Sequence, residues 1–218
     1  GEELFLVDAG GGNGILAQFE KMDISVNRIH HMFVTHKHTD HILGAIWVVR
    51  MVATQMQKGN YKGDFRIYGH KEVVAMLSQF CEMMLAKKHA AFLNECIFFE
   101  EVTEGQTAEI LSYSVTFFDI FSTKAKQFGF TTTLRDGSVL TFTGDEPYNE
   151  ACEKYVIGST WLLHEAFCLD ADKEVFGPYE KHHGTAKDLA TKIIRRAGTR
   201  SLNLYGAVVQ RRLNHLKS

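Results

Sequence analysis

The stretch THKHTDH, Thr35–His41, decides the fold, because four side chains with metal-binding chemistry fall within six residues: His36, His38, Asp40 and His41. The preceding residues, IHHMFV, are mostly β-branched or aromatic, which predicts a buried strand that ends at the cluster. Imidazole and carboxylate groups are zinc ligands, and a catalytic zinc keeps one position open for water. The stretch therefore predicts part of a metal site, whose other ligands come from distant segments.

Three later segments each end an apolar run in further groups of this kind. FTGD ends at Asp145, WLLHEAF contains His164 and Glu165, and HHGT contains His182 and His183 before a predicted helix. Taken singly, an aspartate after glycine is usually a turn residue, and a histidine before a helix is usually solvated. Their occurrence together with the first cluster favours a shared functional site at one edge of a sheet.

Composition narrows the class of protein. The chain has 218 residues, of which 45% are hydrophobic, and this suits a single globular domain over residues 1–218. A net charge of −2 gives no basic excess for nucleic-acid binding. No apolar run reaches 18 residues and no signal peptide is visible, so we expect no membrane span and a cytoplasmic location. Four scattered cysteines, Cys81, Cys96, Cys152 and Cys168, are expected as reduced thiols.

The order of predicted elements indicates α/β layers, because strands and helices mix along the whole chain. Asp136-Gly137 is expected to form a hairpin turn, and a helix is expected after Pro147. Expected strands cover residues 4–7, 29–34, 65–69, 96–102, 113–121, 128–134, 138–145 and 202–209, and expected helices cover residues 15–22, 42–57, 71–88 and 185–198.

T-H-K-H-T-D-H resembles the T-H-x-H-x-D-H signature of the metallo-β-lactamase fold hydrolases. The order of LFLVDAG, FTGD, LLHEA and HHGTAKDLA is similar to that of the ribonuclease Z-like branch, and the likeness spans residues 4–206. The resemblance implies a four-layer αββα sandwich with two metal ions at its edge. The strand or strands that usually precede LFLVDAG are absent here. Because this leaves a sheet edge unpaired, association such as a homodimer is expected.

By this resemblance, His36, His38 and Asp145 bind one metal ion, and Asp40, His41, Asp145 and His183 bind the other. The His-Gly-Thr match favours His183 over His182. The cofactor implied is zinc, as one or two ions, with manganese or iron as alternatives. A metal-bound hydroxide would attack a phosphodiester or a related ester. In the implied mechanism Asp40 takes a proton from the water, and His164, oriented by Glu165, protonates the leaving oxygen.

One position departs from the family pattern. A third histidine is expected just before the Ser122-Thr123 pair, and Phe121 stands there instead. Phenylalanine has no lone pair for a metal, so the first metal is expected to bind more weakly, and the site could hold a single ion. Two alternatives therefore stay open: a lactone or carboxylic ester hydrolase on the same fold, and a catalytically impaired homologue with a binding role.

The expected substrate is a small ester or phosphodiester. Members of the branch that process tRNA carry a long protruding arm, and no such insertion stands out between Phe121 and Asp145. This argues against tRNA as a partner. A charged phosphoryl group would need cationic neighbours such as Lys124, whereas an ester would favour an apolar pocket.

Overall fold

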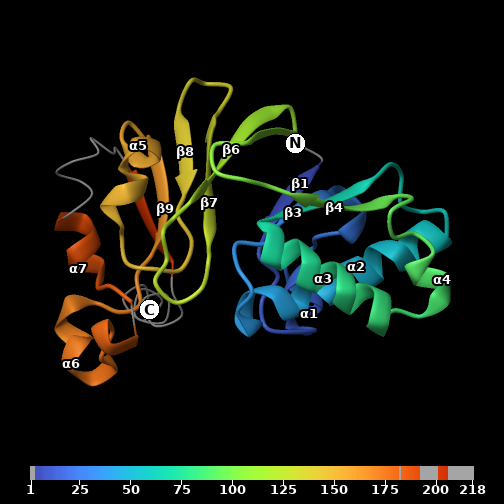
Figure 1. Ribbon diagram of the computed structural model, residues 1–218, viewed down its shortest axis with the longest axis horizontal. Coiled ribbons are helices and arrows are strands. Elements are labelled where there is room, and N and C mark those ends of the chain that lie inside the picture. Colours follow the sequence, from blue (N-terminus) through green and yellow to red (C-terminus); the bar gives the residue numbers. More distant parts are fainter. Residues whose placement is uncertain (1–2, 182, 192–200, 206–218) are drawn as a thin grey trace. The chain divides into compact units, whose positions relative to one another are not determined.

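The computed structural model describes residues 3–181, 183–191 and 201–205 (Figure 1). Its contacts divide the chain into two compact units, residues 1–103 with 110–112, and residues 104–109 with 113–218. The single domain expected over residues 1–218 stays a prediction. His182 and the expected helix and strand residues 192–198 and 206–209 lie outside the described part of the chain.

The first unit is built on a parallel sheet with strand order β1-β2-β3-β4. Its strands are β1 (Leu4–Val7), β2 (Ile29–Phe33), β3 (Phe65–Gly69) and β4 (Ile97–Glu101). Its helices are α1 (Gly14–Lys21), the 3₁₀ turn η1 (Val26–Arg28), α2 (Thr39–Gln57), α3 (Lys71–Met84) and α4 (Lys87–Ala90). Each β-strand leads into the next through a helical crossover, as parallel pairing requires.

Helix α2 forms the centre of this unit. Buried residues such as Ile42, Ala45, Val49 and Val52 recur along it at helical spacing and pack in one cluster with strand residues such as Ile67. The helix begins at Thr39, three residues before the expected start, with His38 as its N-cap. The last three residues of the motif, Thr39–His41, therefore form the first turn of α2. The N-terminus of a helix favours an acidic side chain, and Asp40 lies there.

The second unit contains a six-stranded mixed sheet with the order β10-β9-β8-β7-β6-β5. Its strands are β5 (Thr107–Ile110), β6 (Tyr113–Asp119), β7 (Phe128–Thr133), β8 (Val139–Phe142), β9 (Trp161–Glu165) and β10 (Ser201–Tyr205). Its helical segments are η2 (Glu150–Cys152), α5 (Glu153–Val156), η3 (Asp170–Asp172), α6 (Lys173–Phe176), η4 (Tyr179–Lys181) and α7 (Ala186–Leu189). Strands β6, β7 and β8 pair antiparallel, whereas β8, β9 and β10 pair parallel.

Most expected elements of this unit are confirmed. The turn at Asp136-Gly137 joins β7 to β8, with Gly137 at φ +79°, and α7 starts after Thr185 with a capping box to Asp188. The helix expected at Pro147 begins later, because the Asn149 side chain accepts the Ala151 amide and caps η2 there. Strand β5 was not expected, since it has only four residues and half of them are exposed.

Both units combine a sheet with helices, which confirms the α/β class. Cys81, Cys152 and Cys168 are buried, Cys96 is partly buried, and all four are free thiols, as predicted. Within the described residues, no helix combines the length and the apolar character needed to cross a bilayer.

The loop after β1 lies directly against the start of α2. Gly44 donates its backbone N–H to the Gly10 carbonyl at 2.8 Å, and a Cβ at this position would lie 1.8 Å from the Ala9 carbonyl oxygen. Only glycine fits this contact, because the obstructing atom belongs to the backbone. Gly44 therefore allows β1 and α2 to present their polar residues together.

Replacing Gly44 by alanine should lower the free energy of unfolding by about 1 to 3 kcal/mol, the usual cost of overpacking. The matched control is Gly14→Ala, because a Cβ at Gly14 in α1 meets no atom within 4 Å. That change should be neutral or stabilising by up to about 1 kcal/mol, because alanine favours helix. Urea unfolding of both variants measures the difference. Equal stability of the two would contradict the close approach.

Candidate metal centre

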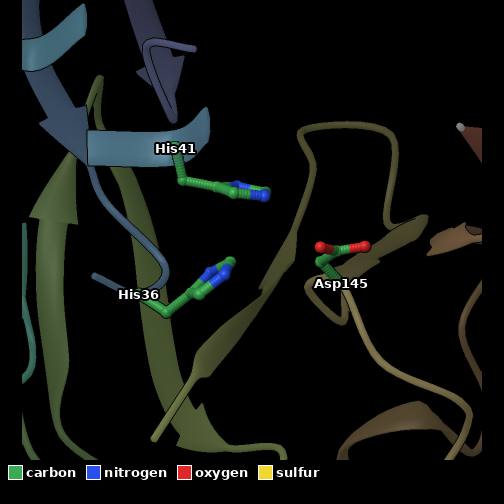
Figure 2. A group of neighbouring side chains, drawn as sticks. All are labelled: His36, His41 and Asp145. Carbon is green, nitrogen blue, oxygen red and sulfur yellow. The ribbon is translucent and has the colours of Figure 1, made fainter. Parts of the chain in front are cut away.

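The first set of predicted ligands lies where β2 leads into α2. His36 is buried in the loop after β2, His38 caps α2, and Asp40 and His41 belong to its first turn. Figure 2 shows the imidazoles of His36 and His41 side by side, with ring centroids 4.1 Å apart. Asp145, also labelled there, belongs to the second unit. The structure thus brings together the four predicted ligands of the first unit.

The carboxylate of Asp8 orients His41. Asp8 follows β1 in the left-handed region, at φ +53°, and its amide donates to the Phe33 carbonyl at 2.8 Å. Its Oδ2 lies 2.8 Å from Nδ1 of His41. A carboxylate only accepts hydrogen bonds, so Nδ1 carries the proton and the lone pair is left on Nε2. A carboxylate behind a histidine is the usual arrangement for a metal ligand.

Asp8 also acts on His36 through Thr35. The carboxylate accepts the Thr35 amide at 2.8 Å and the Thr35 hydroxyl at 2.8 Å. Because that hydroxyl proton points to Asp8, the Thr35 oxygen accepts from Nδ1 of His36, at 2.9 Å. The lone pair of His36 then resides on Nε2, which lies 2.8 Å from Nδ1 of His38. One carboxylate therefore selects the tautomer of two buried or half-buried imidazoles.

Two imidazoles of this set suit a zinc ion. His36 and His41 offer ring nitrogens within 4.8 Å of each other, and imidazole is a ligand that zinc binds well. The Asp40 carboxylate approaches the same place, with Oδ2 3.6 Å from Nε2 of His41, and its side chain is 74% exposed. Such exposure leaves Asp40 open to a substrate or a water molecule.

The second set of predicted residues is centred on Asp145, in the loop after β8. The buried amide side chain of Gln127 binds the backbone of Asp145 twice, accepting its N–H at 3.2 Å and donating to its carbonyl at 3.4 Å. Gly144, at φ +73°, provides the turn that precedes it. Gln127 therefore positions Asp145. No motif marked this glutamine in the sequence.

Three side chains of the second unit converge. Nδ1 of His183 lies 3.2 Å from Oε1 of Glu165 and 3.7 Å from Oδ1 of Asp145. Together the three offer ligand atoms that all lie within 4.8 Å of one another. The neighbouring Glu165 carboxylate raises the pKa of His183, and burial raises the pKa of Glu165. The convergence of Asp145 and His183 agrees with the expected ligands, and Glu165 is an additional candidate.

The expected role of Glu165 as the group that orients His164 is corrected by the geometry. Nδ1 of His164 lies 2.9 Å from the backbone carbonyl of Glu165, whereas the Glu165 carboxylate faces His183. Neighbouring residues on a strand point to opposite faces, so the two side chains of β9 diverge. Burial lowers the pKa of His164 to about 4, which keeps the ring neutral at pH 7. Its role as proton donor stays a prediction.

Phe121, at the position of the missing histidine, lines a pocket. The residue is 45% exposed and its φ is +57°, an unusual value for a residue with a bulky side chain. The Asp119 carboxylate accepts its amide at 2.7 Å, and its carbonyl accepts the Asn149 amide at 3.1 Å. The pocket has a volume of about 450 Å³ and is lined by Phe121, Glu146, Tyr148, Tyr179, His183 and their neighbours.

Changing Asp8 to asparagine should weaken zinc binding by about 10- to 100-fold, the usual effect of losing a carboxylate behind a metal-binding histidine. The side chain of asparagine would place its NH₂ group, which donates, against the N–H and O–H groups that donate to the Asp8 carboxylate. Isothermal calorimetry with zinc measures the change. Asp23→Asn is the matched control, because Asp23 is another aspartate of this unit with positive φ and lies outside the ligand set. Unchanged affinity in Asp8→Asn would show that Asp8 has only a structural role.

Comparison with known proteins confirms the resemblance to the metallo-β-lactamase fold. The short form of human tRNase Z superposes with a TM-score of 0.74, at 21% identity over 97% of this chain and 84% of that chain. The metallo-β-lactamase fold protein YhfI from Bacillus subtilis superposes with a TM-score of 0.70, at 19% identity over 94% of this chain and 74% of that one. At these identities the similarity establishes the fold.

Sequence relatives point to the same branch. Ribonuclease Z of Azobacteroides pseudotrichonymphae is 37% identical over 49 residues, which are 22% of this chain. The matched segments span only 16%, 26% and 22% of the length of three curated ribonuclease Z relatives. The family described as Anti-Pycsar protein Apyc1 matches much more, residues 1–195. The chain therefore belongs to the Anti-Pycsar protein Apyc1 family, and it has the metallo-β-lactamase fold.

Proposed function

We propose that this protein is a metal-dependent hydrolase that acts on a phosphodiester or a related small ester. The main support is the Asp8 network, in which one carboxylate directs lone pairs of His36 and His41 as metal ligation requires. The name of the matched family states no chemical reaction. The reaction is therefore inferred from the residues of the site.

The proposal keeps both ligand sets as places that could hold a metal ion: His36, His38, Asp40 and His41 in the first unit, and Asp145 and His183 in the second. Metal ions held there would polarise the scissile bond and lower the pKa of a water molecule. In this proposal Asp40, the most exposed of the set, accepts the proton of the attacking water. Asp8 and Gln127 touch no substrate and position the ligands around them.

We extend the proposal to the pocket beside His183, as the place where the substrate binds. Its volume of about 450 Å³ lies in the range of small-molecule sites. The rings of Tyr148 and Tyr179 and the exposed face of Phe121 offer apolar contacts. Lys124 supplies a cation whose charge acts on His183, and its ammonium group donates to the Lys181 carbonyl. A cation beside the ligands favours a phosphodiester over a neutral ester.

Turnover of chromogenic substrates tests this assignment. The zinc- or manganese-loaded protein should hydrolyse bis(p-nitrophenyl) phosphate faster than p-nitrophenyl acetate or a lactone, since only the first brings a negative charge to Lys124. Lys124→Ala should reduce the phosphodiester rate and leave the other rates unchanged. Faster turnover of the neutral esters would favour the lactone or carboxylic ester hydrolase. No turnover of any of them with full metal loading would favour the impaired homologue.

Phe121→His tests the account of the missing ligand. A histidine at this position should raise the metal content of protein purified without added metal, and with it the phosphodiesterase rate. Elemental analysis gives the content as equivalents per chain. Phe121→Leu is the control, because it removes the ring without adding a nitrogen and should leave the metal content as it is. Equal metal content in the histidine variant and the wild type would refute a ligand position at residue 121.

A further inference from the structure

A groove on the first unit lies outside both ligand sets. It has a volume of about 680 Å³, within the range of small-molecule sites. The loop after β1, helix α2 and the end of α3 form its walls, with residues 11–13, Leu43, Ile46, Trp47, Arg50, Met84 and Leu85. The proposed hydrolysis uses none of these side chains, so the groove is free for another role.

The lining of this groove is mainly apolar and partly open to solvent. Ile46 is buried, Leu43, Trp47 and Leu85 are half-buried, and Met84 is 67% exposed. Methionine is unbranched and flexible, so its side chain can adapt to the shape of a ligand. The groove therefore offers apolar contacts to a ligand that lies along α2.

The Arg50 end of the groove carries positive charge. The guanidinium carbon of Arg50 lies 5.4 Å from the centre of the Trp47 ring. No carboxylate of the described residues forms an ion pair with Arg50 or with Lys88. Burial, and then the charges of Lys88 and Arg50, lower the pKa of His89, so both cations act on the same region. An anionic group at Arg50 would therefore meet an attractive potential.

The spacing along α2 separates the apolar contacts from this charge. Leu43, Trp47 and Arg50 follow one another at intervals of four and three residues, which places them on one face of the helix. Leu43 and Arg50 are ~10 Å apart along the helix axis. A ligand on this face thus needs an apolar chain of about that length that ends in an anionic group.

We propose that this groove binds an unbranched fatty carboxylate, with the carboxylate at Arg50 and the acyl chain against Leu43 and Trp47. Arginine binds carboxylates through charge-assisted hydrogen bonds that can be bidentate. A peptide suits the groove less well, because its backbone N–H and C=O groups would need hydrogen-bond partners that an apolar lining does not supply. The site requires no metal ion and is independent of the proposed hydrolysis.

Trp47 reports binding directly, because the chain has two tryptophans and Trp161→Phe leaves Trp47 as the single one. Titration of this full-length variant with decanoate, below its micelle-forming concentration, should shift the Trp47 emission to shorter wavelength and saturate. Affinity should rise from octanoate to dodecanoate by up to about fourfold for each added methylene group. Decanol should bind more weakly than decanoate, and decyltrimethylammonium more weakly still.

Arg50→Gln, made in the same background, removes the partner of the carboxylate. It should weaken decanoate binding by about tenfold or more, because hydrogen bonds to a charged group are lost. Decanol binding should stay unchanged. Arg135→Gln is the matched control, since Arg135 also lies over an aromatic ring, that of Tyr113 at 5.8 Å, but belongs to the second unit. This control variant should bind decanoate as its parent does.

Two neighbouring methionines test the apolar wall. Met84→Glu replaces a lining side chain by a negative charge and should weaken decanoate binding by about tenfold or more. Met83→Glu is the control, because Met83 is 74% exposed and does not line the groove. Both methionines are largely exposed, so neither change should unfold the protein, and thermal unfolding checks this.

Several results would overturn the carboxylate site. They are the absence of any Trp47 response, equal affinity for the anionic, neutral and cationic amphiphiles, and unchanged decanoate binding in Arg50→Gln. Self-association that Met84→Glu abolishes, without any binding of decanoate, would instead make a second copy of the chain the occupant of the groove. Sedimentation velocity at several protein concentrations measures that association.

Discussion

The carboxylate of Asp8 is the group on which the first ligand set depends. It accepts from the Thr35 amide, the Thr35 hydroxyl and His41 Nδ1, and each hydrogen bond to a charged group contributes about 1.5–3 kcal/mol. These bonds offset the left-handed backbone of Asp8, which aspartate tolerates better than most residues. The close contact at Gly44 is the second requirement, because it brings the first turn of α2 to this carboxylate.

Much of this unit could be predicted from the sequence, for a physical reason. Strand β2 and helix α2 are local patterns, and the junction between them must contain Thr35–His41 whatever the rest of the chain does. The part played by Asp8 was harder to foresee, because it depends on the pairing of β1 with β2. The motif LFLVDAG placed the carboxylate at a strand end, but only the structure shows which imidazoles it contacts.

The second unit was less predictable, because its site depends on side-chain directions. The sequence located Asp145, His164, Glu165 and His183 at the ends of elements, and the structure agrees. It could not show that the Glu165 carboxylate faces His183, since the direction of a side chain on β9 follows from the register of that strand. Gln127 was missed for the same reason, as its two bonds to Asp145 join residues 18 positions apart.

The two ligand sets are held in different ways. In the first unit, hydrogen bonds through Nδ1 already fix the orientation of His36 and His41. In the second unit, an ion pair with an N–O distance of 3.2 Å joins the buried Glu165 carboxylate to Nδ1 of His183, and Gln127 holds the backbone of Asp145. The strained backbone of Phe121, beside the same pocket as His183, shows that this unit already tolerates unfavourable features where a ligand is expected.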